Sequence, residues 1–295
     1  MNSHLGLGYR LCHPELPVPE PRRNRSDTMK DHSLTQAIPD ILARIVAKKR
    51  EELANVRAFV EEWGRQAERR RPELRDFRQA VSTRVPAIIA EVKKASPSKG
   101  ILAADFDPAR TASAYERGGA VAVSVVTDAE FFQGSLTDLE AARRAVALPV
   151  LRKDFTIAAA QILEAAAHGA DAILLIAAIL TAREIRDLRE AAARSGVAAL
   201  VEVHNRHELD AALDAGSEII GVNNRDLATF EVTLETSLWL AEHIPEGVVR
   251  VSESGIRDAG DIARLRAAGY TAFLVGEHLM RSRDPASALR KLVGP

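Results

Sequence analysis

Cysteine, aromatic residues and long apolar runs are all scarce in this chain of 295 residues. The one cysteine, Cys12, has no partner for an internal disulfide, and no Cys/His group has the spacing of zinc ligands. No apolar run approaches the roughly 20 residues that a bilayer span requires, and the N-terminus lacks the basic start and apolar stretch of a secretion signal. We therefore expect a cytoplasmic protein without a metal or cofactor.

An excess of charge of either sign is also missing. The chain has 40 Lys and Arg against 41 Asp and Glu, a formal net charge of −1. Such a balance provides no global field for nucleic acid or an anionic membrane, so neither is an expected partner. Any anion must be bound by a local site.

The first 35 residues differ from the rest in composition. Four prolines lie there among polar and basic residues without apolar periodicity, so we expect a leader with little order over residues 1–35. Met29 offers a second start, and we expect residues 1–28 to be dispensable. Residues 36–295 are expected to form one domain that includes N-terminal helices over residues 38–80. The first of these is predicted by apolar residues at helical spacing, namely Ile38, Ile41, Leu42, Ile45 and Val46.

Short apolar runs alternate with helical segments from residue 87 onward. This alternation indicates a parallel sheet covered by helices, and eight runs fit a closed barrel better than an open sheet of five or six strands. The expected fold class is therefore α/β, a (β/α)8 TIM barrel with an N-terminal helical extension. The expected strands are Ala87–Val92, Ala120–Val126, Pro149–Arg152, Ala172–Ile176, Ala198–Val203, Glu218–Val222, Val248–Val251 and Thr271–Val275.

The carboxyl ends of these expected strands carry charge. Glu91 and Lys93 share one face of the first strand, because side chains alternate along a strand. Four charged residues on odd-numbered strands could meet at one level of the barrel mouth, near Asn223. These four are Lys93, Lys153, Glu202 and Glu253. A buried ion network that only satisfies itself is the alternative, but interior charges return little net stability, so the group favours an active site.

A phosphate site is the second candidate. Ser254-Gly255 and Gly276-Glu277 follow the seventh and eighth expected strands, where barrels often bind phosphate through backbone N–H groups. The loop Ser96–Gly100 is too long for a tight turn and is predicted to be a mobile flap that adds Ser96 to this site. Ordinary turns are the alternative.

Two other features stand out in the loops. Phe131-Phe132 forms an aromatic pair on a polar loop, which predicts an apolar wall for a planar ligand, although packing of one ring into the core stays open. His204 and His207 flank Asn205-Arg206 after the fifth strand. We predict no metal there, because a third ligand is missing, and expect Asn205 to cap a helix that leaves both histidines exposed.

Several segments together resemble the indole-3-glycerol phosphate synthase family. The resemblance covers about residues 36–295 and includes the helix Ile41–Leu53. Its motifs are Ile88–Ser98 (IIAEVKKASPS), Phe132–Ser135 (FQGS), Leu151–Phe155 (LRKDF), Leu200–Val203 (LVEV), Ile220–Leu227 (IGVNNRDL), Ser252–Ile256 (SESGI) and Val275–Glu277 (VGE).

The resemblance implies conversion of 1-(2-carboxyphenylamino)-1-deoxyribulose 5-phosphate to indole-3-glycerol phosphate, in tryptophan biosynthesis. It implies Lys153 as the acid for ring closure and Lys93 as the group that holds the substrate carboxylate and protonates the departing hydroxyl. Glu202 matches the base for dehydration. Groups that order the lysines and the sugar hydroxyls are matched by Glu91, Asn223 and Glu253.

The family's binding pocket is matched in the same way. Its phosphate site matches Ser96, Ser254, Gly255, Gly276 and Glu277. Glu277 would contribute its backbone N–H, and we expect its side chain to point outward. The ring pocket matches Phe132, Leu174 and Leu227, with Arg225 beside it as a candidate contact to the substrate carboxylate.

Two other functions are alternatives. Phosphoribosylanthranilate isomerase would share the glycines after strands seven and eight, but it is expected to use a cysteine and aspartate pair, and the expected barrel contains no cysteine. A non-catalytic barrel subunit is the alternative from another class. Expected partners are the phosphorylated small-molecule substrate and, as candidates, other tryptophan-pathway enzymes.

Overall fold

The computed structural model describes residues 40–54, 56, 58–103 and 105–294. The expected leader, including Met29, lies outside these residues. No helix among them is long and apolar enough to cross a membrane.

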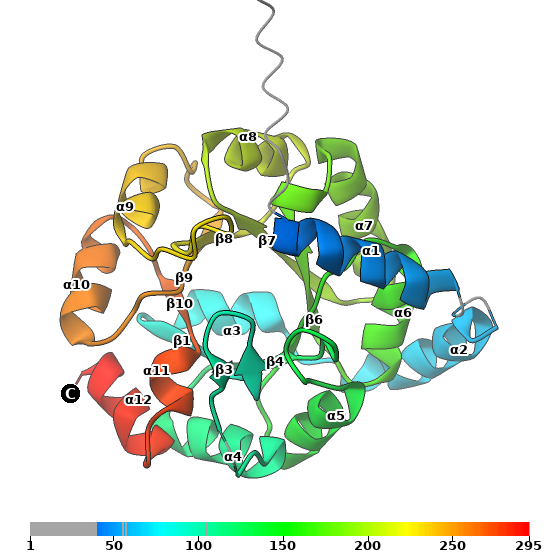
Figure 1. Cartoon of the computed structure of the whole chain (residues 1–295), viewed down its shortest axis with the longest axis horizontal. Helices are drawn as coiled ribbons and strands as arrows, with labels where there is room; N and C mark the ends of the chain where they lie inside the picture. The colour runs from blue at the N-terminus through cyan, green and yellow to red at the C-terminus, as the bar shows by residue number, and fades with distance from the viewer. Residues whose placement is uncertain (1–39, 55, 57, 104, 295) are drawn as a thin grey trace, which may run out of the picture. The chain divides into compact units, whose positions relative to one another are not determined.

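Eight parallel strands close into a barrel, as the sequence predicted (Figure 1). Each expected run matches a strand to within two residues at either end. The order around the barrel is β1-β10-β9-β8-β7-β6-β5-β4, and β1 also pairs with β4, which closes the cylinder. The strands are β1 (Ala87–Val92), β4 (Ala122–Val126), β5 (Val150–Lys153), β6 (Ala172–Ile176), β7 (Ala198–Val203), β8 (Ile219–Asn223), β9 (Val249–Glu253) and β10 (Ala272–Val275).

Helices surround this barrel and alternate with its strands (Figure 1). Several begin at a polar side chain that accepts a backbone N–H of the first turn, which satisfies a donor left free at a helix start. These caps are Asp107, Ser135, Thr181, Asn205, Asp258 and Asp284. The helices are α4 (Pro108–Gly118), α5 (Leu136–Ala145), α6 (Ala159–Ala167), α7 (Ala182–Arg194), α8 (Arg206–Asp214), α9 (Glu235–Ala241), α10 (Ala259–Ala267), α11 (Glu277–Met280) and α12 (Pro285–Val293).

Alternation along each strand divides the apolar side chains into two layers. In β1, Ile88 packs in the layer between sheet and helices, whereas Ile89 packs with residues of other strands inside the barrel. Both side chains are fully buried. The barrel interior is therefore a packed core, and the polar side chains of the site come from the strand ends.

Within the described part of the chain, three α-helices precede β1: α1 (Asp40–Ala54), α2 (Val60–Arg70) and α3 (Phe77–Thr83). Phe77 and Val81 of α3 are buried against the core inside the barrel. Because α3 leads directly into β1, it covers the amino-terminal end of the barrel and leaves the carboxyl end for a site.

Lys49 anchors α1 to the loops after two strands. Its side chain is 4% exposed, and its Nζ lies 3.0 Å from Asp128, which follows β4, and 3.0 Å from Asp154, which follows β5. Burial disfavours the charged form, but the charges of Asp154 and Asp128 outweigh it and raise the pKa of Lys49. These ion pairs hold α1 at the mouth of the barrel, where Ile41 and Ile45 reach the pocket described below.

Replacing Lys49 by methionine is expected to lower the free energy of unfolding by about 3 kcal/mol, since it leaves two buried carboxylates without this cation. Lys48 is the matched control, because it lies on the same helix and pairs with the exposed Glu51 and Glu130. Lys48→Met should cost less than about 1 kcal/mol. Urea unfolding of the three proteins measures both values, and equal losses in the two variants would contradict the anchoring role.

Candidate active site

A pocket opens at the carboxyl ends of the strands, where the sequence predicted the site. All the predicted site residues line it, although they come from separate strands and the loops after them. They are Glu91, Lys93, Ser96, Phe132, Lys153, Leu174, Glu202, Asn223, Arg225, Leu227, Glu253, Ser254, Gly255, Gly276 and Glu277.

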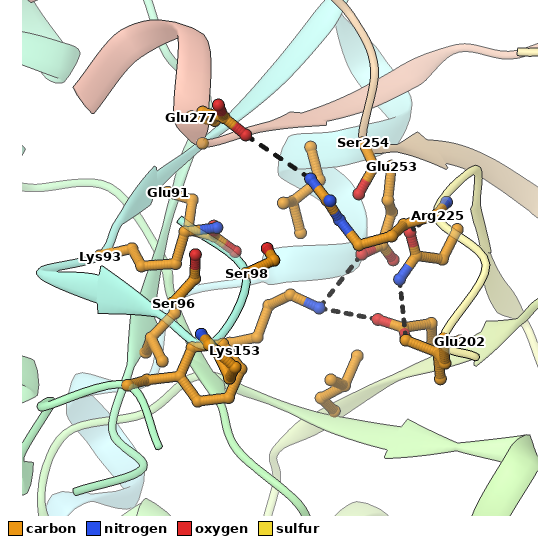
Figure 2. Close-up of a pocket in the computed structure, with 18 of the residues that line it drawn as sticks. Glu91, Lys93, Ser96, Ser98, Lys153, Glu202, Arg225, Glu253, Ser254 and Glu277 are labelled. Atoms are coloured by element: carbon orange, nitrogen blue, oxygen red, sulfur yellow. Dashed lines mark hydrogen bonds and ion pairs between the residues drawn. The ribbon is translucent and has the colours of Figure 1, made fainter. Parts of the chain in front are cut away.

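Lys153 forms the centre of the charged group (Figure 2). Its Nζ donates to Glu202 Oε2 at 2.7 Å and to Glu253 Oε2 at 3.2 Å. Burial disfavours the ammonium ion, but the charges of Glu202, Glu253 and Glu91 outweigh burial and raise the pKa of Lys153. Lys153 is thus held protonated, with carboxylates beside it.

The two carboxylates that contact Lys153 differ in their surroundings. Burial opposes ionisation of Glu202, but Lys153 and His204 offset it and hold the pKa of Glu202 below its ordinary value. Burial, together with repulsion from Glu202 and Glu91, outweighs Lys153 at Glu253 and raises the pKa of that carboxyl. Two neighbouring carboxyl groups with opposite shifts are typical of acid–base sites.

Lys93 lies apart from this triplet. The sequence predicted that it could meet Lys153, Glu202 and Glu253 at one level, but its Nζ pairs with Glu91 Oε1 at 2.5 Å. The alternation along the first strand, which places Glu91 and Lys93 on one face, accounts for this pair. The pocket therefore holds two ammonium groups, Lys93 beside Glu91 and Lys153 beside Glu202 and Glu253.

Asn223 connects Glu202 to the loop after β8. Its Nδ2 donates to Glu202 Oε1 at 3.1 Å, and its Oδ1 accepts the backbone N–H of Arg225 at 3.0 Å. Arg225 Nη2 in turn lies 3.5 Å from Glu277 Oε2 (Figure 2). Glu277 Oε1 also lies 3.3 Å from Arg281 Nε. The side chain of Glu277, which was expected to point outward, thus lies between two arginines at the rim of the pocket.

The predicted phosphate residues follow three neighbouring strands of the barrel, β1, β10 and β9, and all of them line the pocket. Ser254 and Gly255 both have positive φ, +66° and +81°, which is unusual for serine and marks a constrained turn. Ser96 reaches the pocket from a hairpin of β2 (Ala95–Ser96) and β3 (Gly100–Ile101). The expected flap therefore has a short sheet of its own, and its mobility stays a prediction.

Apolar residues also line the pocket. Phe132 reaches it as expected, and the ring of Phe155, which the sequence did not single out, lies 6.1 Å from it. Phe131 instead lies under the guanidinium of Arg44 at 5.9 Å. Ile41 and Ile45 of α1 complete the wall. Their helical period was visible in the sequence, but the surface on which the helix docks was not.

Gly221 of β8 is a further residue that sequence reasoning missed. A methyl group at its Cα would collide with the Glu253 carboxylate and lie 3.3 Å from Leu200. A glycine inside a strand often marks such a close approach, and this is the signal that could have found it.

Replacing Gly221 by alanine is expected to displace Glu253 from Lys153 and to lower the free energy of unfolding by about 1–3 kcal/mol through overpacking. Gly64 of α2 is the control, because a methyl group there meets nothing within 4 Å. Gly64→Ala should instead raise stability by up to about 1 kcal/mol. Urea unfolding and kcat would be measured for both, and full activity with unchanged stability in Gly221→Ala would contradict the close contact.

Among the residues that the structure describes, no group of three or more His, Cys, Asp or Glu is placed to hold a metal ion. The fold and the pocket define the class of protein: a (β/α)8 barrel with a pocket of paired charges at the carboxyl ends of its strands.

Comparison with known proteins assigns the family. Residues 42–292 match the family model described as indole-3-glycerol phosphate synthase. The indole-3-glycerol phosphate synthase of Dechloromonas aromatica is 51% identical over 263 residues, covering 86% of this chain and 98% of that protein. The enzyme of the same name from Koribacter versatilis is 49% identical over 265 residues, covering 89% and 99%. The chain belongs to the indole-3-glycerol phosphate synthase family.

Solved structures with distant sequences share the barrel. A thiamine phosphate pyrophosphorylase from Pyrococcus furiosus has a TM-score of 0.54 at 15% identity, covering 70% of this chain and 93% of that one. KGPDC from Streptococcus mutans has a TM-score of 0.55 at 15% identity, covering 71% and 96%. At such identities the likeness concerns the fold alone.

Proposed function

We propose that this chain converts 1-(2-carboxyphenylamino)-1-deoxyribulose 5-phosphate to indole-3-glycerol phosphate, releasing carbon dioxide and water, and so acts as a carboxy-lyase of tryptophan biosynthesis. The observation that carries the proposal is the contact of the Lys153 ammonium with Glu202 and Glu253 inside the pocket that Ser254 and Gly255 also line. Family membership supports the choice of substrate.

Lys153 is proposed as the acid for ring closure. The ring carbon that bears the carboxylate attacks the sugar ketone, and negative charge develops on the ketone oxygen. A proton from the Lys153 ammonium neutralises this charge. Loss of carbon dioxide then restores the aromatic ring. The two carboxylates that hold Lys153 protonated before the step also stabilise its return to that state.

Lys93 and Glu202 are proposed for the dehydration that follows. Lys93, paired with Glu91, holds the substrate carboxylate and later protonates the departing hydroxyl. Glu202 removes the proton that must leave as the double bond of the indole forms. Its ionised form, favoured by Lys153 and His204, is the form that this role requires. Asn223 and Glu253 hold these groups in place.

The remaining pocket residues are proposed to bind the substrate. Ser96, Ser254, Gly255, Gly276 and Glu277 would hold the phosphate, Glu277 through its backbone N–H. Phe132, Leu174 and Leu227 would enclose the anthranilate ring. Arg225 would contact the substrate carboxylate, for which it would turn from its 3.5 Å pair with Glu277. We also propose a cytoplasmic location and a single domain over residues 36–295, with pathway enzymes as candidate partners.

A turnover assay tests the proposal. The purified full chain is mixed with the carboxyphenylamino substrate, without added metal or nucleotide, and the indole product is followed by its fluorescence. We expect turnover, and the same rate after treatment with a chelator. A protein that binds the substrate without turning it over would instead be the non-catalytic barrel that the sequence left as an alternative.

A further inference from the structure

His204 lies directly after β7, two residues beyond Glu202. The sequence predicted that both His204 and His207 are exposed beside the helix cap Asn205. The cap and the exposure of His207 are confirmed, but the side chain of His204 is only 10% exposed. The expectation for His204 is wrong because its ring turns back toward the barrel and lies between two carboxylates.

Both ring nitrogens of His204 face carboxylate oxygens. Nδ1 lies 2.9 Å from Glu208 Oε2, and Nε2 lies 3.3 Å from Glu202 Oε1. Nε2 is buried and makes no hydrogen bond with any residue that the structure describes. Its nearest charged neighbour is thus the carboxylate proposed to act as the base.

Glu208 holds the ring in this orientation. Glu208 Oε2 also accepts the backbone N–H of His204 at 2.8 Å, and Oε1 accepts from Asn205 Nδ2 at 2.7 Å. Glu208 is itself buried in the first turn of α8. The ring is therefore held by the start of α8.

This arrangement favours a charged ring over a neutral one. A neutral imidazole has one N–H and one lone pair, and here the lone pair would face a carboxylate oxygen whichever nitrogen carried it. The charged groups that bear on the ring are Glu202 of β7, Glu208 of α8 and Asp226 of the loop after β8. Burial lowers the pKa of His204, but Glu202 and Glu208 outweigh burial and raise it to about 10.

We propose that His204, held by Glu208, is a positioning residue that keeps the Glu202 carboxylate ionised and oriented for the dehydration step. This inference rests on the proposed role of Glu202 as the base. His204 and Asn223 both lie against Glu202 Oε1, whereas Oε2 faces Lys153. The imidazolium thus adds a second positive charge beside the base without occupying the side that faces Lys153.

The pH dependence of kcat distinguishes this role from a structural one. Glutamine in place of His204 removes a positive charge from Glu202, so the pKa of Glu202 rises and the acid limb of kcat should move up by about one pH unit. At neutral pH Glu202 stays ionised in both proteins, so a several-fold fall of kcat with nearly unchanged KM is expected there from the lost orientation of the carboxylate alone. His207→Gln is the matched control and should change neither quantity, because His207 is exposed on the same helix. An unmoved acid limb in folded His204→Gln overturns the proposal.

A second measurement does not depend on a folded variant. Nitrogen-15 NMR of the unaltered protein at pH 7.5 should show protons on both ring nitrogens of His204. The signals of His204 are assigned by their loss in His204→Gln. If that variant does not fold, they are assigned through the backbone resonances. A neutral ring overturns the proposal. Glu202→Gln separates the role of Glu202 as the base from the role of His204. Full activity in Glu202→Gln refutes the role of Glu202. If Glu202→Gln is inactive and the pH profile of His204→Gln is unshifted, only the role of His204 is refuted.

Discussion

Alanine in place of Lys153 is expected to lower kcat by about 10²- to 10⁴-fold, the range for loss of a general acid. The Lys153 ammonium is the group that contacts both Glu202 and Glu253, and its removal leaves the developing charge on the ketone oxygen without its proton donor. Carbon dioxide release in a single turnover should slow by the same factor, because ring closure precedes it. Stopped-flow detection of carbon dioxide, together with indole fluorescence, measures both steps.

Two further variants control for loss of structure. Lys291→Ala removes an exposed lysine on α12 and should leave kcat unchanged. Lys153→Arg keeps a positive charge between the carboxylates but replaces the ammonium by a guanidinium, which does not give up its proton. We therefore expect Lys153→Arg to fold and to lose most of the activity. Full activity in either Lys153 variant would contradict its role as the acid.

Glutamine in place of Glu202 is expected to lower kcat for indole formation by about 10²- to 10⁴-fold, since an amide cannot take up the proton lost during dehydration. The amide keeps nearly the size and shape of the carboxylate, and its oxygen can still accept from Asn223 or Lys153. Substrate affinity and stability should therefore change little.

The order of the steps gives this variant a specific signature. Because dehydration follows decarboxylation, Glu202→Gln should release carbon dioxide in a single turnover well before indole fluorescence appears. Glu190→Gln on the surface of α7 is the control and should behave like the unaltered protein. If carbon dioxide release and fluorescence slow equally, Glu202 acts on ring closure by holding Lys153, and the proposed base must be another group.

Much of the fold could be predicted because its signals are local. The strands are apolar runs, and the helices between them start at residues such as Asp107, Ser135 and Asn205 that accept a backbone N–H. The charged residues after the first helix predict a second helical stretch from about Leu53 to Arg70, but α1 runs to Ala54 and α2 begins only at Val60, so this start was placed wrongly. Propensity alone does not fix where such a stretch turns.

The sequence by itself determined that Glu91, Lys153, Glu202 and Glu253 end parallel strands, and parallel strands in a closed barrel end at one rim. Only the tertiary structure decided which charges meet. Lys153 contacts carboxylates 49 and 100 residues away, and Lys49 reaches two loops from a helix outside the barrel. The same holds for the burial of His204 against Glu202. Such contacts depend on the stagger of the strands and on side-chain packing across the barrel, and neither is encoded in a local pattern of residues.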